Sequence, residues 1–160
     1  MQRSRGFSLI ELLVAVAVLG LLLGIAVPGL SRYRDTLSQQ QARNQLITDL
    51  RYARQTSVTR HRSVIVAFGN GSVTTNITSY TLHTDLDGDR VKDSNEPKLF
   101  RALPKKVRLS IVALSPVDSL IFDTSGLLIP GSTGGRLVIA GARGRPDTLA
   151  VSAVGMVYDP

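Results

Sequence analysis

The feature that most constrains this chain is an apolar run near its start. From Leu12 to Leu30 the sequence contains no charged residue. A helix of about 20 apolar residues, rising ~1.5 Å per residue, spans the ~30 Å hydrocarbon core of a bilayer. Because a buried globular helix seldom needs so continuous an apolar surface, the run predicts a membrane-spanning helix.

A secretory signal peptide is the main alternative, because Arg3 and Arg5 precede the apolar run. Signal peptides have apolar regions of roughly 7 to 15 residues that end at a small-residue cleavage site. This run is longer and continues into a helical pattern, so we expect the segment to be retained. Arg32 and Arg34 follow it, and the positive charges on its two sides therefore do not decide its orientation in the membrane.

Glu11 places a carboxylate one turn into this apolar stretch, where an ionised group is costly unless it is paired. In one interpretation the side chain reaches the headgroup region near the helix end. The other interpretation requires cleavage after Gly6, which would give Phe7 a free α-amino group. That cation on a neighbouring copy would neutralise Glu11 in the low-dielectric layer and set the axial register between subunits.

The helix is expected to continue beyond the apolar run. Pro28 and Gly29 should bend or locally melt it, but neither Gly nor Pro occurs from Ser31 to about Arg62. The predicted apolar stripe consists of Leu37, Leu46, Leu50, Ala53, Ser57 and Val58. The predicted polar face consists of Gln39 to Gln41, Arg43, Arg51 and Arg54. This amphipathic pattern predicts that the second half of the helix packs on a globular head.

Beyond Arg62 the sequence changes to short runs rich in Val, Ile, Thr and Tyr, separated by turn residues. These runs predict strands at residues 63–68, 79–84, 98–101, 107–112, 120–122, 136–140, 148–151 and 156–158, with a hairpin turn at Gly69-Asn70-Gly71. We expect mostly antiparallel pairing. The fold class is therefore α+β, with a long N-terminal helix whose second half packs on a β-sheet head.

The residues around Glu11 resemble the leader and cleavage motif of type IV prepilins and type II secretion pseudopilins. The resemblance is carried by Arg5-Gly6-Phe7-Ser8-Leu9-Ile10-Glu11-Leu12-Leu13, and by Pro28, where such proteins have a helix-bending proline. It implies the type IV pilin fold, cleavage after Gly6 by a prepilin peptidase, methylation of the new amino group of Phe7, and a role for Glu11 in filament assembly. The implied organisation is a leader (1–6), a transmembrane and assembly helix (7–30) and a periplasmic head (31–160).

The head resembles one branch of that family, the GspH/FimT-type minor pilins and pseudopilins. The similarity is carried by Asn44-Gln45-Leu46 to Ala53-Arg54 and by residues 96–101, 121–126 and 149–155. It implies a structural subunit that crosses the inner membrane once and assembles with other pilin subunits. The filament would be a type IV pilus, a type II secretion pseudopilus or part of a competence apparatus, and these three alternatives stay open.

A cluster of acidic residues lies between two predicted strands. Carboxylates occupy positions 1, 3, 5, 9 and 12 of a twelve-residue segment: Asp85, Asp87, Asp89, Asp93 and Glu96. This spacing is typical of calcium loops, since calcium prefers six to eight oxygen ligands. However, Arg90 replaces the glycine that permits the sharp turn at position 6, and Lys92 adds a second cation. The alternative is a solvated acidic turn.

The chain is basic, with 19 Lys and Arg residues against 12 Asp and Glu, and a formal net charge of +7. A basic protein surface can bind the phosphates of DNA, anionic lipid headgroups or acidic neighbours in a filament. The net charge alone does not decide between these partners. The resemblance adds the alternative of a DNA receptor for natural transformation, because some FimT-type pilins carry a Gly-Arg-x-Arg motif near the C-terminus. Here Met156 and Tyr158 occupy both arginine positions, which leaves Arg143 and Arg145 as candidate DNA contacts.

Catalytic motifs are missing from the sequence. His61 and His83 lie in different predicted elements without a nucleophile motif beside them, and the glycine-rich segment 131–135 lacks the lysine of a phosphate-binding loop. There is no cysteine, which excludes a disulfide framework and a thiolate zinc site. We therefore expect no enzymatic activity and, apart from the calcium alternative, no cofactor.

Overall fold

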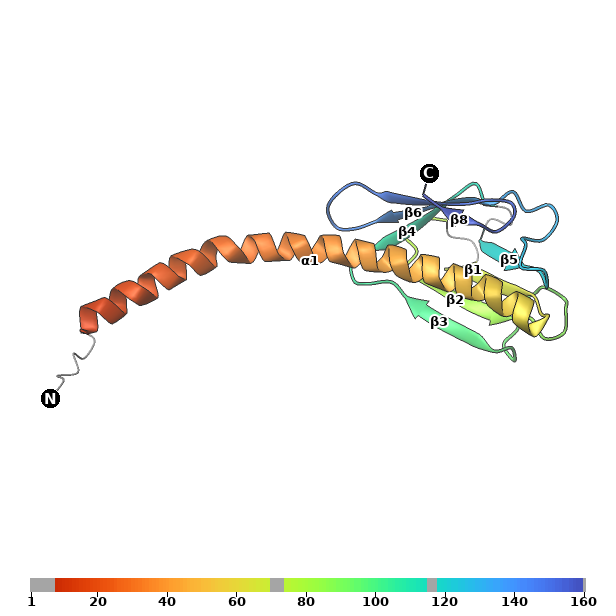
Figure 1. Ribbon diagram of the computed structural model, residues 1–160, viewed down its shortest axis with the longest axis horizontal. Coiled ribbons are helices and arrows are strands. Elements are labelled where there is room, and N and C mark those ends of the chain that lie inside the picture. The colour runs from red at the N-terminus through yellow and green to blue at the C-terminus, as the bar shows by residue number, and fades with distance from the viewer. Residues whose placement is uncertain (1–7, 70–73, 115–117, 160) are drawn as a thin grey trace. The chain divides into compact units, whose positions relative to one another are not determined.

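The computed structural model describes residues 8–69, 74–114 and 118–159, with only the backbone of residues 26–28 (Figure 1). One helix, α1 (Leu9–Arg60), precedes all the strands. The strands are β1 (Val64–Phe68), β2 (Ser79–Thr84), β3 (Lys98–Ala102), β4 (Arg108–Val112), β5 (Ser119–Phe122), β6 (Gly135–Ala140), β7 (Asp147–Val151) and β8 (Val157–Tyr158). Each predicted strand is therefore present, with its ends shifted by at most one residue.

Helix α1 is continuous through Pro28 and Gly29. Of the two outcomes expected there, a bend or local melting, melting does not occur. A proline removes one backbone donor and displaces one carbonyl, but the hydrogen-bonded turns on both sides preserve the helix. The chain divides into two compact units, residues 1–34 and residues 35–160, and the second unit is called the head below.

The strands of the head form two four-stranded sheets rather than a single one. The first has the order β3-β2-β1-β5 and the second the order β4-β6-β7-β8. All pairings between these strands are antiparallel, as predicted. The sheets are connected by a bridge in which Ile77 and Leu109 exchange two backbone hydrogen bonds of 2.9 Å. The predicted hairpin residues Asn70 and Gly71 lie outside the described residues.

The core of the head forms where one stripe of α1 meets one face of each sheet. Alternate residues of the strands enter it, among them Val64, Val66 and Phe68 of β1 and Leu137 and Ile139 of β6. From α1 the buried residues include Ala42, Leu46, Leu50, Ala53 and Ser57. The amphipathic pattern therefore predicted the correct helical face.

Two details of the predicted helix faces are wrong. Val58 was assigned to the buried stripe, but its side chain is 44% exposed. Gln39 was assigned to the polar face, but its amide donates hydrogen bonds to the carbonyl oxygens of Ile139 and Arg145, at 3.4 and 2.9 Å. Loops of the head also contact the side of α1 next to its buried stripe. A polar side chain such as Gln39 therefore faces the head there, because it binds the backbone of a loop.

Helix α1 ends in a capping motif that turns the chain into β1. His61 adopts a positive φ of 50°, its N–H donates to the carbonyl of Val58, and the N–H of Arg62 donates to the carbonyl of Ser57. This pair of bonds is the Schellman pattern, which satisfies carbonyls that a helix end leaves unpaired. The Arg62 guanidinium also donates to the carbonyl of Leu86 and thereby connects the helix end to the acidic loop.

Candidate functional site

The first half of α1 is apolar and uncovered. Every residue from Leu9 to Ile25 is exposed, including Leu9, Leu21 and Ile25 at 81%, 68% and 72%. By length and composition, α1 is able to cross a membrane, and none of its apolar window is buried within the chain. Burial of apolar surface contributes about 25 cal/mol per Å², so this segment requires lipid or other helices around it.

Glu11 lies in the first turn of this apolar half, and the turn begins with a capping interaction. The backbone N–H of Glu11 donates to the Ser8 carbonyl at 3.1 Å and to the Ser8 hydroxyl at 3.3 Å. Ser8 followed by Glu three residues later is a capping-box sequence, a signal that identifies the helix start from sequence. Of the other predicted assembly residues, Gly6 and Phe7 lie outside the described residues, and Pro28 is described by its backbone only.

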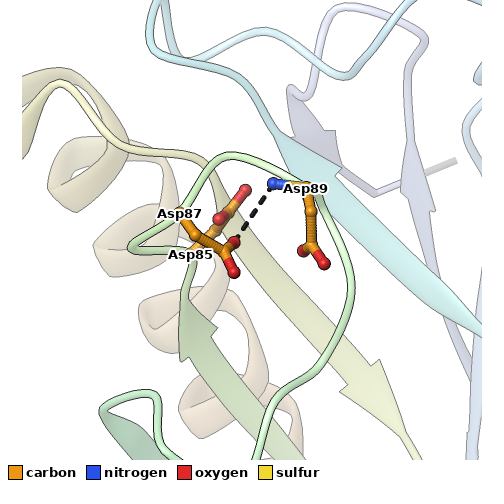
Figure 2. Close-up of side chains that lie close together, drawn as sticks. All are labelled: Asp85, Asp87 and Asp89. Atoms are coloured by element: carbon orange, nitrogen blue, oxygen red, sulfur yellow. Dashed lines mark hydrogen bonds between the residues drawn. The ribbon is translucent and has the colours of Figure 1, made fainter.

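The acidic loop, residues 85–96 between β2 and β3, brings part of the predicted ligand set together. Figure 2 shows Asp85, Asp87 and Asp89, which each place one carboxylate oxygen within 4.8 Å of the others. Asp85 is buried, whereas Asp87 and Asp89 are exposed. Asp93 and Glu96 do not join this group. The Glu96 carboxylate instead accepts backbone hydrogen bonds from Leu86, at 2.8 Å, and Asp93, at 3.4 Å.

Backbone donors already occupy carboxylate oxygens of this loop. Asp85 accepts from the N–H groups of Gly88, at 2.6 Å, and Arg90, at 3.1 Å. Asp87 accepts from Asp89, and Asp89 from Val91. Arg90 has a φ of 62°, so the sharp turn forms although an arginine replaces the expected glycine. These bonds stabilise the turn.

Calcium binding by the acidic loop stays a prediction. The measurement that checks it is a calcium-dependent rise in melting temperature that disappears in Asp87→Asn, with magnesium as the control cation. Neighbouring His83 lies outside the carboxylate cluster, and its Nε2 is 3.0 Å from the Thr81 hydroxyl. Burial lowers the pKa of His83, and this effect outweighs the opposing attraction of Glu96.

Arg143 and Arg145, the candidate DNA contacts, lie on the exposed loop between β6 and β7. With Thr36, Gln39 and Gln40 of α1 they line a pocket of about 340 Å³. The Gln39 amide fixes this loop through its bond to the Arg145 carbonyl, so both guanidinium groups extend from a backbone that is held in place. This arrangement presents positive charge at the surface but does not identify the ligand.

A buried polar network, which the sequence did not reveal, connects α1 to the first sheet. The Asp49 carboxylate, 4% exposed, accepts hydrogen bonds from the Tyr80 hydroxyl at 2.6 Å and from Arg101 Nε at 3.0 Å. Burial raises the pKa of Tyr80, and the hydrogen bond to Asp49 raises it further. Because α1, β2 and β3 each contribute one member, only the tertiary structure brings them together.

Comparisons with known proteins agree with this architecture. A family model described as type II transport protein GspH matches residues 42–155, and one described as a prokaryotic N-terminal methylation motif matches residues 1–27. Two crystal forms of the type IV minor pilin FimU from Pseudomonas aeruginosa resemble the chain, each at 19% identity and over 76% of this chain. Their TM-scores are 0.56 and 0.54, over 87% and 91% of the FimU chains. No curated protein matches the sequence.

Proposed function

This chain belongs to the type II transport protein GspH family and carries the prokaryotic N-terminal methylation motif, and from this premise we propose how it is stored and assembled. It is a minor pilin or pseudopilin, a structural subunit with the type IV pilin fold. Membership of the family implies processing at its N-terminus and assembly with other pilin subunits. The family is structural, and we assign the chain no catalytic role.

In the proposed cycle the subunit is stored in the inner membrane through a single pass of α1, with its head in the periplasm. The observation that carries this proposal is the uncovered apolar surface from Leu9 to Ile25. Lipid covers that surface during storage, and the helices of neighbouring subunits cover it in the filament. The apolar burial is similar in both environments, so transfer from lipid to filament does not require the surface to face water.

Prepilin peptidase is proposed to cut after Gly6 and leave a methylated amino group on Phe7. Mass spectrometry of the N-terminus of the membrane-extracted chain tests this step. The expected mature chain lacks residues 1–6 and carries one methyl group on Phe7. The control is Gly6→Leu, which is expected to retain the leader because a bulky side chain replaces the residue at the cut. A chain that still begins at Met1 in cells with active peptidase would contradict the proposal.

Glu11 is proposed to pair with the Phe7 amino group of a neighbouring subunit. Among the described residues no ion pair neutralises Glu11 within its own chain, and an unpaired carboxylate in an apolar layer is costly. The same residue stands at the glutamate position of the capping box, so a test must separate its charge from its effect on the helix start.

The variant Glu11→Gln makes this separation, because glutamine also suits a capping box but has no charge. We expect Glu11→Gln to remain in the membrane and to be lost from sheared filaments, as measured by immunoblotting of both fractions. Ser8→Ala, which removes the capping hydroxyl but keeps the carboxylate, is the matched control and should still be incorporated. Normal incorporation of Glu11→Gln would overturn the charge-pairing role.

A further inference from the structure

Two loops at one end of the head carry exposed cations that the proposed assembly cycle does not use. The loop between β3 and β4 contains Lys105 and Lys106, and the loop between β6 and β7 contains Arg143 and Arg145. All four residues are exposed. We call these four residues the basic collar.

Specific contacts hold both loops against the same short segment of α1, residues 35–40. Lys106 Nζ lies 3.2 Å from an Asp35 carboxylate oxygen. The Gln39 amide donates to the carbonyl of Arg145 at 2.9 Å, and Gln40 lines the pocket beside Arg143. The collar is therefore built on the first turns of the head's helical segment, although its two loops are far apart in sequence.

The covalent chain keeps this segment close to the apolar run. The run ends at Leu30, and Asp35 follows five residues later within the continuous helix α1. Five residues rise ~7.5 Å as an α-helix. Even fully extended they span at most ~18 Å. If the run lies in a bilayer, the first residues of the α1 segment on which the collar is built therefore lie near the headgroups.

Among the described residues, nearby carboxylates neutralise only one of the four collar residues. Asp35 is paired with Lys106. Arg43 binds both Asp147, at 2.9 Å, and Asp159. In the part of the chain that the structure describes, no ion pair joins a carboxylate to Lys105, Arg143 or Arg145. The collar therefore presents excess positive charge to its surroundings.

We propose that the basic collar docks the head onto the headgroups of anionic phospholipids while the subunit is stored in the membrane. This proposal rests on the proposed membrane storage. Lipid is favoured over nucleic acid as the source of phosphate because the span tethers the collar beside a lipid surface, which raises the local concentration of headgroups. Cations attract an anionic bilayer within about a Debye length, which is ~10 Å at 0.1 M salt. Docking keeps the head at the membrane until extraction breaks these contacts.

The test uses the full chain in nanodiscs, because the span is part of the proposed tether. The sequence has no cysteine, so Ala142→Cys places a single fluorescent label in the exposed loop beside Arg143. Lipids with a nitroxide on the headgroup quench the label when the loop lies at the membrane surface. We expect quenching to increase when phosphatidylcholine is supplemented with about 30% phosphatidylglycerol, and to decrease between about 0.1 M and 1 M salt.

The decisive variant carries Arg143→Gln and Arg145→Gln. Each cation near an anionic surface contributes roughly fivefold to the docking equilibrium, so we expect this double variant to lose most of the response to phosphatidylglycerol. The matched control, Arg51→Gln with Arg60→Gln, removes two exposed cations that lie at least ~16 Å from Gln40 along α1. This control should keep the response, since it removes the same number of charges but leaves all four collar residues in place.

The outcomes separate the alternatives. Equal quenching in both lipid mixtures, or an equal response of the double variant and the control, overturns lipid docking. Duplex DNA that binds wild type but not the double variant in pure phosphatidylcholine discs, without any response to phosphatidylglycerol, assigns the collar to nucleic acid instead. A chain that does not enter the nanodisc contradicts the proposed membrane storage, whereas a chain that enters without responding contradicts only the docking.

Discussion

The two halves of α1 share one backbone conformation but differ in what covers them. Apart from Glu11, residues 9–25 carry no charge, and all of them are exposed, whereas in residues 42–57 only one stripe is buried, by strands of the same chain. A helix with a single apolar stripe can satisfy that stripe within its own domain, but a helix that is apolar all round needs a lipid or protein environment that one chain does not supply. The comparison therefore divides α1 into a structural half and an assembly half.

Truncation of a core leucine should give the largest difference between the halves. Leu50 is 1% exposed in the core, and Leu50→Ala is expected to lower the free energy of unfolding of the head by about 2 to 5 kcal/mol. Urea denaturation of the detergent-solubilised chain, followed by circular dichroism, measures this change. Leu19→Ala removes the same atoms from the exposed half and should leave the unfolding of the head unchanged. Equal effects of the two substitutions would refute the division.

Two carboxylates of α1 provide a second comparison. Asp49 is buried and accepts hydrogen bonds from Tyr80 and Arg101. Asp49→Asn removes the charge that compensates Arg101, and the partly exposed arginine moderates the loss to about 2 to 3 kcal/mol of unfolding free energy. Glu11→Gln should not alter this free energy, because Glu11 belongs to the assembly half. Denaturation of both variants under the same conditions measures the contrast.

The Asp49 network should also make the stability of the head depend on alkaline pH. The pKa of Tyr80 is raised above its ordinary value of 10.0, so the folded chain keeps a proton that the unfolded chain releases. This contribution is complete well below pH 10 and decreases as the pH rises through 10, by about 1 kcal/mol between pH 10 and pH 11. Tyr80→Phe should lack this component. Parallel slopes for wild type and Tyr80→Phe in urea denaturation series would argue against the raised pKa of Tyr80.

The smallest effect is expected where the head begins, at the ion pair between Asp35 and Lys106. The Lys106 side chain is 67% exposed, so solvent screens the pair, and Asp35→Ala should change the unfolding free energy by less than about 0.5 kcal/mol. Thermal melting at low and high salt measures this. A loss as large as that of Asp49→Asn would show that the Asp35 contact is part of the folding core of the head.

Local patterns of the sequence were sufficient to predict much of this fold. Periodicity predicted the buried face around Leu46 and Leu50, and short β-branched runs predicted all eight strands. The errors at Val58 and Gln39 arose because the position of a residue on a helical face does not reveal which loops contact its flank. The division of the strands into two sheets was also not predicted, because pairing depends on contacts between segments that are distant in sequence.

The candidate sites show the same contrast between features that local sequence predicts and features that depend on tertiary contacts. By itself, the sequence determined the features that depend on neighbouring residues: the apolar span, Glu11 within it and the acidic spacing from Asp85. Only the tertiary structure decided that Asp49, Tyr80 and Arg101 share a hydrogen-bond network, that Asp93 and Glu96 stay outside the carboxylate cluster, and that two basic loops contact residues 35–40 of α1. The physical reason is that periodicity and spacing act within a few residues, whereas these contacts form only when folding brings distant segments together.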